Sequence, residues 1–206
     1  LGVHYKTRSI DGLFNTLINS FDNDFKGMPE DIAEENFQAR IRGITLMGFA
    51  NKFKGMVLAT SNKSELAVGY STIYGDMVGG FCVLKDVPKT LVYKLAKYIN
   101  KKETIIPNRI ITREPTAELK FNQTDQDNLP SYDILDSIIN LYIEQKISPK
   151  AIARKGFDSQ VVKKVVELIH GSEFKRRQSA PGPKITSKAF SVDRRYPITN
   201  RYKPKI

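Results

Sequence analysis

The stretch TSNKSELAVGYSTIYGDMVGG, residues 60–80, decides the fold because it follows directly on the short apolar run MVLA at residues 56–59. An apolar run that passes into polar residues and then into glycines is the order of a strand, a site, a helix and a loop. Ligands of open α/β sheets bind at the carboxyl edge of the strands. We therefore predict that the polar side chains of residues 60–65 converge on a ligand, although an ordinary N-cap at Ser61, Asn62 or Ser64 explains the turn equally well.

Patterns of apolar residues on both sides of this stretch predict an α/β architecture. Alternation indicates a strand over residues 3–10, and helical spacing follows at residues 11–21 and again at 32–54. A second strand at 56–59 then needs crossover connections, which favour a three-layer fold with a mainly parallel sheet. Amphipathic helices after Ser131 predict an α-rich C-terminal part.

Between these two parts the chain carries a helix and a long polar segment. The run DVPK at residues 86–89 opens the helix, since Pro88 suits a first helical turn. Periodicity then disappears from residue 103 to residue 130, which in a compact domain marks a functional or a disordered loop. We expect an ordered, functional loop there.

The length of 206 residues and the hydrophobic fraction of 40% fit one domain with its own core. The formal net charge is +11, and residues 175–206 carry +9 of it, from ten Lys or Arg and one Asp. We therefore predict a domain over residues 1–178 and a basic tail over residues 179–206. Such a tail is compatible with a solvated arm, a polyanion-binding arm or a strap that closes over substrate phosphates.

The single cysteine, Cys82, cannot form a disulfide within the chain, and no signal peptide or apolar span of membrane length is visible. These features predict a protein of the reducing cytoplasm, with no membrane partner. Base-reading motifs are missing as well, which argues against a nucleic-acid partner.

Four further runs accompany residues 60–80 in a fixed order: VLKDVPKTLVYKLAKY at 83–98, EPTAEL at 114–119, QTDQD at 123–127 and LPSYDILD at 129–136. Together they resemble the NAD synthetase family, with dense similarity from Asn36 to Asp136 that returns at residues 173–177. Ammonia-only members usually carry a lysine where Ile73 stands here, so the resemblance is to the glutamine-dependent branch. It implies a Rossmann-like, adenine nucleotide alpha hydrolase-like fold.

The resemblance implies a ligase that amidates deamido-NAD to NAD through an acyl-adenylate, which ammonia attacks. ATP is the second substrate and Mg²⁺ the metal, and a glutaminase domain outside this chain supplies the ammonia. The family also implies a homo-oligomer. Such chemistry rests on positioning and electrostatics more than on a covalent nucleophile, so the lack of a Ser-His-Asp pattern does not contradict it.

Six positions match the family's binding residues. The resemblance implies that Thr60, Lys89 and Thr116 bind ATP and that Asn36, Glu65 and Lys175 bind deamido-NAD, with Glu65 also serving the metal. A lysine can oppose a triphosphate, and a carboxylate can supply a hard oxygen ligand for Mg²⁺. Taken singly, each residue is also compatible with an ordinary surface or capping role.

The family's phosphate loop, a Ser-Gly-Gly-x-Asp-Ser run after the first strand, occurs nowhere in the sequence. Since its backbone amides would cradle the pyrophosphate, we expect the chain to be a piece that starts after this loop. Two alternatives remain at this point. Another ATP pyrophosphatase family would lack the DVPKT and QTDQD runs, and a polyanion-binding module would act through the tail with a steep salt dependence.

Overall fold

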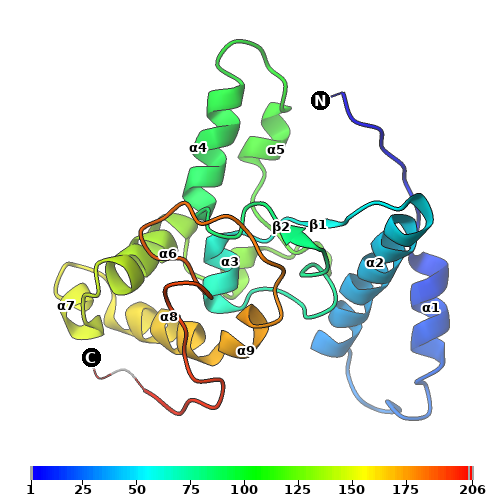
Figure 1. Cartoon of the computed structure of the whole chain (residues 1–206). Helices are drawn as coiled ribbons and strands as arrows, with labels where there is room; N and C mark the ends of the chain where they lie inside the picture. The colour runs from blue at the N-terminus through cyan, green and yellow to red at the C-terminus, as the bar shows by residue number, and fades with distance from the viewer. Residues whose placement is uncertain (1, 204, 206) are drawn as a thin grey trace.

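The computed structural model describes residues 2–203 and 205 and contains mostly helices (Figure 1). The elements follow in the order α1 (Asp11–Asn19), α2 (Ile32–Phe53), β1 (Leu58–Ala59), α3 (Lys63–Val68), β2 (Phe81–Cys82), α4 (Lys89–Ile99), α5 (Asn108–Thr112), η1 (Asp125–Asp127), α6 (Tyr132–Ile139), η2 (Asn140–Glu144), α7 (Pro149–Ala153), α8 (Ser159–Gly171) and α9 (Glu173–Arg176). None of the helices in this part of the chain combines the length and the apolar composition that a membrane crossing needs.

The sheet has two parallel strands, with Leu58 opposite Phe81 and Ala59 opposite Cys82. The predicted strand at residues 56–59 is therefore confirmed in its second half, while β2 was not foreseen. Parallel pairing of β1 and β2 with α3 between them in the chain is the β-α-β order that the α/β interpretation requires.

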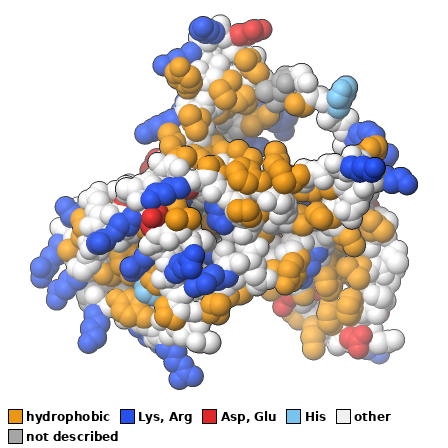
Figure 2. All heavy atoms as spheres, viewed as in Figure 1, with side chains coloured by type: hydrophobic (Ala, Val, Ile, Leu, Met, Phe, Trp, Pro, Cys, Tyr) orange, Lys and Arg blue, Asp and Glu red, His pale blue; other side chains and the backbone are white. Residues whose placement is uncertain are grey.

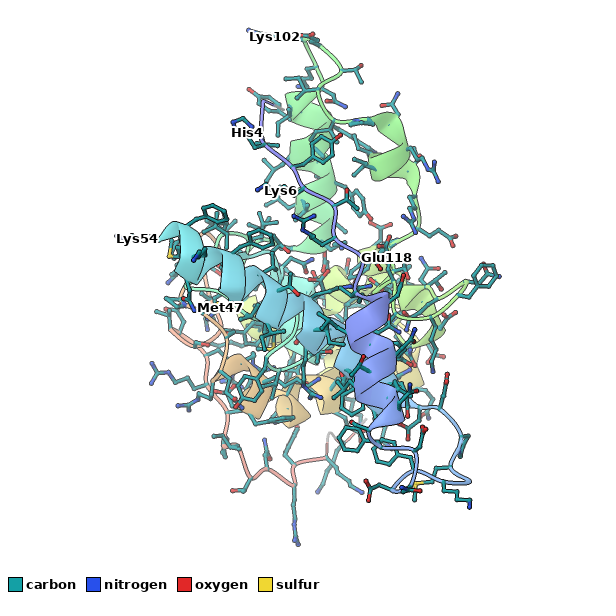
Figure 3. The ribbon with its side chains drawn as sticks, turned by 90° about the vertical axis from the view of Figure 1, so that its right-hand side faces the viewer. His4, Lys6, Met47, Lys54, Lys102 and Glu118 are labelled. Carbon is teal, nitrogen blue, oxygen red and sulfur yellow. The ribbon has the colours of Figure 1, made fainter. Side chains whose placement is uncertain are left out.

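The strand predicted over residues 3–10 is wrong for the described residues, among which this segment forms no β-bridge. It is extended and exposed, and Figure 3 shows His4 and Lys6 on it, leading into α1. Alternation of apolar residues indicates which face of an extended segment is apolar. A β-strand forms only when a neighbouring strand pairs with its backbone N–H and C=O groups. Lys6 instead places its ammonium 5.4 Å from the centre of the Phe53 ring.

The main core lies between α3, α6 and α8, which confirms the expected α-rich C-terminal part. In α8 the apolar residues recur at spacings of three and four, so Val162, Val165, Val166 and Ile169 all face the core and are fully buried. Asp158 begins that helix by accepting hydrogen bonds from the backbone amides of residues 160 and 161. The core thus holds α3 rigidly, and α3 carries the turn of residues 60–65.

Residues 179–203, called here the C-terminal strap, run back across the domain (Figure 1). Ala189, Phe190 and Tyr196 are buried, and the guanidinium of Arg176 lies 4.8 Å from the Phe190 ring centre. The described part of the tail is therefore packed against the domain and is not a solvated arm. Figure 2 shows Lys and Arg side chains spread over the lower-left part of this face, where α7, α8 and the strap lie.

His170, at the end of α8, ties the strap to the core. The Asn200 amide lies 2.9 Å from Nδ1 and the Tyr142 hydroxyl 2.7 Å from Nε2, while the Tyr196 ring centre is 4.2 Å from the imidazole. Because an amide nitrogen can only donate, Nδ1 accepts and Nε2 carries the proton. Burial, followed by the charges of Arg194 and Arg176, lowers the pKa of His170 to about 4.

We expect His170 to make the protein less stable in mild acid. The pKa of this imidazole in the unfolded chain is about 6.5. Between pH 6.5 and about pH 4 it is therefore protonated in the unfolded state and neutral in the folded state. Stability is then complete above about pH 6.5 and falls by roughly 1 kcal/mol towards pH 5, after a discount for solvent screening. Urea unfolding midpoints at the two pH values measure this slope. His170→Gln should flatten it and His4→Gln should not; equal slopes in all three proteins would refute the assignment.

Candidate functional site

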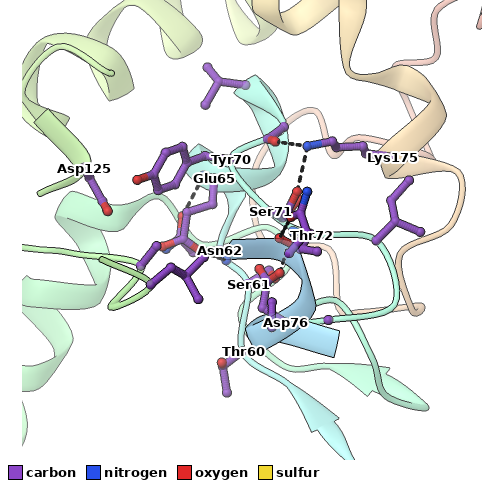
Figure 4. A pocket seen from close by; sticks show the side chains of 18 of the residues that line it. Thr60, Ser61, Asn62, Glu65, Tyr70, Ser71, Thr72, Asp76, Asp125 and Lys175 are labelled. Atoms are coloured by element: carbon purple, nitrogen blue, oxygen red, sulfur yellow. Dashed lines mark hydrogen bonds between the residues drawn. The ribbon is translucent and has the colours of Figure 1, made fainter. Parts of the chain in front are cut away.

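A cavity of about 970 Å³ opens beside the turn that follows β1 (Figure 4). Its walls come from α2, from the turn and α3, from residues 69–78, from the start of α4, from the loop before α6 and from α9. The six residues that the resemblance assigns to a ligand line this cavity: Asn36, Thr60, Glu65, Lys89, Thr116 and Lys175. The predicted convergence of residues 60–65 is correct for Thr60, Ser61, Asn62 and Glu65 but wrong for Lys63 and Ser64, whose side chains bond elsewhere. The structure therefore brings together side chains that are far apart in the sequence.

The turn itself is built as a capping box. The Asn62 side chain accepts a hydrogen bond from the Glu65 backbone amide at 3.0 Å, and the Glu65 carboxylate accepts one from the Asn62 amide at 3.1 Å. The ordinary reading of the turn as a helix cap is thus confirmed, and it coexists with the cavity. Thr60 precedes the box and is exposed, so its hydroxyl is free to meet a ligand.

Lys89 stands at the first position of α4 and faces Glu65. Its ammonium lies 3.0 Å from the Glu65 carboxylate and 5.3 Å from the centre of the Tyr132 ring. Burial by itself would lower the pKa of Lys89, but the neighbouring Glu65 carboxylate outweighs it and raises the pKa. The lysine is therefore charged at neutral pH, and with a fifth of its side chain exposed it can also reach an anion in the cavity.

Asp136 on α6 fixes the start of α4, a role that we did not predict. Its carboxylate accepts hydrogen bonds from the Ser64 hydroxyl and from the Thr90 amide and hydroxyl, the last two at 2.9 and 2.7 Å. Ser64 in turn accepts from the Lys89 amide at 2.8 Å. One sequence signal was available, because the spacing of four from Tyr132 puts Asp136 on the buried side of its helix.

Asn36 and Lys175 hold the loop after α3 from two sides. Asn36 accepts a hydrogen bond from the Thr72 hydroxyl at 2.7 Å, and Lys175 donates to the carbonyls of Gly69 and Ser71, each at 2.7 Å (Figure 4). Gly69 has a φ of 69°, and a Cβ there would collide with the Ser172 hydroxyl, so only glycine fits. Burial lowers the pKa of Lys175, and the charge of Asp76 partly opposes this.

Asp125 lines the cavity and is a second residue whose role we did not predict, although it lies in the QTDQD run. It is buried, and one carboxylate oxygen accepts a hydrogen bond from the Tyr132 hydroxyl at 2.7 Å. Within the described part of the chain the other oxygen has no hydrogen-bond partner. Burial, and after it the charge of Asp125, raises the pKa of Tyr70. A buried acceptor without a partner at a cavity wall suits a donor group of a ligand.

The segment from residue 103 to residue 130 is ordered, as expected, and its second half closes the cavity against α2. Gln38 donates to the Leu119 carbonyl at 3.0 Å, and the Lys120 ammonium pairs with Glu35. Thr116 accepts from the Glu118 amide at 3.1 Å and lines the cavity beneath this contact. The loop therefore contributes Thr116 to the same cavity as the α3 turn.

The described residues fit a metal ion only in part. Within residues 2–203 and 205, no three histidine, cysteine or carboxylate side chains lie close enough together to bind one by themselves. Both oxygens of Glu65 already have partners, namely the Lys89 ammonium and the Asn62 amide. Since Mg²⁺ takes one or two carboxylates and completes its shell with substrate phosphates and water, Glu65 would suit an ion that the phosphates of a bound nucleotide also coordinate.

Comparison with known proteins gives a consistent result. The family model described as NAD synthase matches residues 1–179. The glutamine-dependent NAD(+) synthetase of Acinetobacter baylyi is 54% identical over 206 residues, covering 99% of this chain and 38% of that protein. The corresponding protein of Aquifex aeolicus is 50% identical over 98% of this chain and 36% of its own length.

Solved structures agree with the sequence relatives. A glutamine-dependent NAD+ synthetase of Acinetobacter baumannii, in complex with adenosine diphosphate, is 49% identical, with a TM-score of 0.50 over 96% of this chain and 35% of that one. A glutamine-dependent NAD(+) synthetase of Cytophaga hutchinsonii is 23% identical, with a TM-score of 0.78 over 97% of this chain and 34% of the other; this likeness concerns the fold alone. The chain thus spans little more than a third of the length of these proteins.

Proposed function

This chain belongs to the NAD synthase family, whose model matches residues 1–179, and on that premise we propose that it forms the synthetase part of an enzyme that amidates deamido-NAD to NAD. ATP activates the carboxylate, and ammonia completes the amide. One observation carries the proposal: the residues that the resemblance assigns to ATP and to the dinucleotide line a single cavity large enough for a nucleotide.

The residues divide between the two ligands. On the ATP side, the Lys89 ammonium opposes the phosphates, while the hydroxyls of Thr60 and Thr116, which line the same cavity, bind base, ribose or phosphate oxygens. In the proposed reaction the dinucleotide carboxylate attacks the α-phosphorus of ATP, with pyrophosphate as the leaving group. Ammonia then forms the new C–N bond and its nitrogen loses one proton to solvent, while AMP departs with the electrons of the broken acyl–oxygen bond.

On the dinucleotide side, Asn36, Glu65 and Lys175 lie along the wall formed by α2, α3 and α9. The ammonium of Lys175 suits a phosphate or the substrate carboxylate. Glu65 is our candidate for Mg²⁺ as well, sharing the ion with phosphates that also attract Lys89. When bound, the ion neutralises charge on the phosphates; the chain's own part is to orient them and to keep water from the activated carboxylate.

For the complete domain we propose a three-layer fold with a larger, mainly parallel sheet, because β1 and β2 pair in parallel with α3 between them in the chain. A glutaminase domain as the source of ammonia, a homo-oligomeric state and a cytoplasmic location follow from the same family membership. Each of these is a proposal for the whole protein to which this sequence belongs.

The direct test uses the complete protein that contains this chain. Purified protein, deamido-NAD, ATP, Mg²⁺ and either glutamine or ammonium should give NAD, AMP and pyrophosphate in equal amounts, measured by mass spectrometry. Omission of ATP should abolish the product. If NAD does not form while the protein is folded and binds nucleotide, or if ADP and phosphate replace AMP and pyrophosphate, the proposed reaction is wrong.

Lys175 should matter more than the charges of the strap. Lys175→Ala should raise the KM for deamido-NAD about tenfold, because a half-buried ammonium bound to two carbonyls is held in place, whereas distant charges act only over about 8 Å at physiological salt. The comparison protein carries Arg194→Ala and Arg195→Ala together, both at exposed positions. Steady-state kinetics on the two proteins decide the matter, and an equal or reversed ranking would mean that the tail acts as a distributed electrostatic arm.

A further inference from the structure

The C-terminal strap reaches the back of the candidate site through a buried lysine that the proposed function does not use. Lys63, the first residue of α3, is 1% exposed. Its ammonium donates to the Glu144 carboxylate at 3.0 Å, to the Thr186 hydroxyl at 2.5 Å and to the Lys188 carbonyl at 2.9 Å. Thus the residue between Asn62 and Ser64 points away from the cavity, into the strap.

Asp86, in the turn that precedes α4, completes the contact. Its carboxylate lies 3.2 Å from the Lys63 ammonium and accepts hydrogen bonds from the amides of Ile185 and Thr186, at 2.9 and 2.7 Å. The Thr186 hydroxyl donates to the same carboxylate at 2.8 Å. Asp86 stands three residues before Lys89, so one point of the strap holds the chain that enters α3 and the chain that enters α4.

Charge explains why this cluster needs the strap. A lysine at the first position of a helix sits at the positive end of the helix dipole and is unfavourable there unless carboxylates oppose it. Asp86 and Glu144 supply that opposition, but a buried ion pair is stable only when its remaining donors and acceptors are satisfied. The backbone amides of residues 185 and 186 and the Thr186 hydroxyl satisfy them.

The strap is held against the domain on both sides of this cluster, so Thr186 stays in a fixed position relative to Lys63 and Asp86. Before it, the Pro181 carbonyl accepts a hydrogen bond from the Cys82 amide at 2.8 Å, and the Ala180 carbonyl accepts one from Lys85 at 2.6 Å. After it, Ala189 and Phe190 are buried. In Figure 1 the orange-to-red segment accordingly passes from the sheet across α3.

We propose that Thr186 is a positioning residue of the candidate site: through Asp86 and Lys63 it fixes the starts of α3 and α4, and with them Glu65 and Lys89. The inference rests on the proposed function for its effect on ATP. Loss of the Thr186 hydroxyl removes one hydrogen-bond partner from the Lys63 ammonium and one from the Asp86 carboxylate. The starts of α3 and α4 are then no longer joined through this hydroxyl. No strap residue needs to touch the nucleotide for this to happen.

The test uses the complete protein with Thr186→Val, which keeps the side-chain volume, and Thr186→Ser, which restores the hydroxyl. Thr112→Val is the matched control, because that hydroxyl bonds only to a carbonyl of its own exposed helix. At a temperature well below unfolding, Thr186→Val should raise the KM for ATP about tenfold, the scale of one lost hydrogen bond to a charged group, and leave the KM for ammonium unchanged. The serine variant should restore the KM.

Hydrogen exchange gives a second reading that does not depend on turnover. In Thr186→Val the backbone amides of Lys63, Lys89 and Thr90 should exchange faster, while those of α8 should not. A lower unfolding temperature with unchanged KM and unchanged exchange at these amides would show a merely structural role and overturn the proposal. If the wild-type protein made no NAD, the proposed function would fail, yet the exchange experiment would still decide whether the strap holds the two helix starts.

Discussion

Replacing Lys89 with alanine should lower kcat/KM for ATP about a hundredfold in the complete protein, which corresponds to roughly 3 kcal/mol. Two effects add. The phosphates lose a charge-assisted contact. In addition, the Glu65 carboxylate loses the ammonium that lies 3.0 Å from it, so its negative charge repels the phosphates. Because the lysine's side chain is four-fifths buried, water replaces the ammonium poorly. Steady-state kinetics with ATP varied measure the loss.

A lysine on the solvent side of the same helix serves as the control. Lys97→Ala removes an identical charge from an exposed position on α4 and should leave kcat/KM for ATP within about twofold, since surface charges contribute little. Glu65→Ala should weaken the dependence of the rate on magnesium concentration. Wild-type rates in both Lys89→Ala and Glu65→Ala would show that the cavity residues have been given the wrong roles.

Arg176→Ala should destabilise the folded chain by about 3 to 5 kcal/mol, the largest loss that we expect from a single side chain. The guanidinium is 1% exposed, bonds to Glu173 and donates to the Ala67 and Ile169 carbonyls at 2.8 and 2.6 Å. Its loss would bury a carboxylate short of a partner and leave two carbonyls unsatisfied. It would also remove the cation from above the Phe190 ring.

The neighbouring arginine separates this effect from charge in general. Arg177 pairs with the other oxygen of Glu173 at 2.7 Å, but 43% of its side chain is exposed, so Arg177→Ala should cost only about 1 kcal/mol. Chemical denaturation of the two variants at neutral pH gives both numbers. Similar losses would mean that the pair at Arg176 is no more desolvated than a surface salt bridge.

The sequence was most informative where the structure is local. The turn at residues 60–65 was predictable because a cap and its helix involve neighbours only, and α8 was predictable because its apolar period alone determines the buried side. The six ligand positions came from the family resemblance, and the cavity now supplies a geometric reason for them. Their individual roles remain predictions.

Long-range contacts explain what the sequence did not reveal. Thr186 meets Asp86 across a separation of 100 residues, and no local pattern marks a threonine in a basic, proline-rich tail as a partner for a buried carboxylate. The composition of the tail left a solvated arm open beside a strap, because no sequence pattern shows that Phe190 and Tyr196 pack over the buried guanidinium of Arg176. Residues 3–10 show the converse error, since their alternation is real while the described chain offers no strand beside them.

The two edges of the small sheet have different consequences for handling the protein at the bench. The Pro181 carbonyl bonds to the Cys82 amide and so shields the β2 edge, whereas β1 has an outer edge that no described residue pairs, next to the half-exposed Leu58 and the exposed Met56. An unpaired edge beside apolar side chains invites another chain to add to it. We therefore expect the isolated 206-residue polypeptide to self-associate. Its apparent molar mass from light scattering should rise with protein concentration, and replacing Leu58 with lysine should reduce that rise.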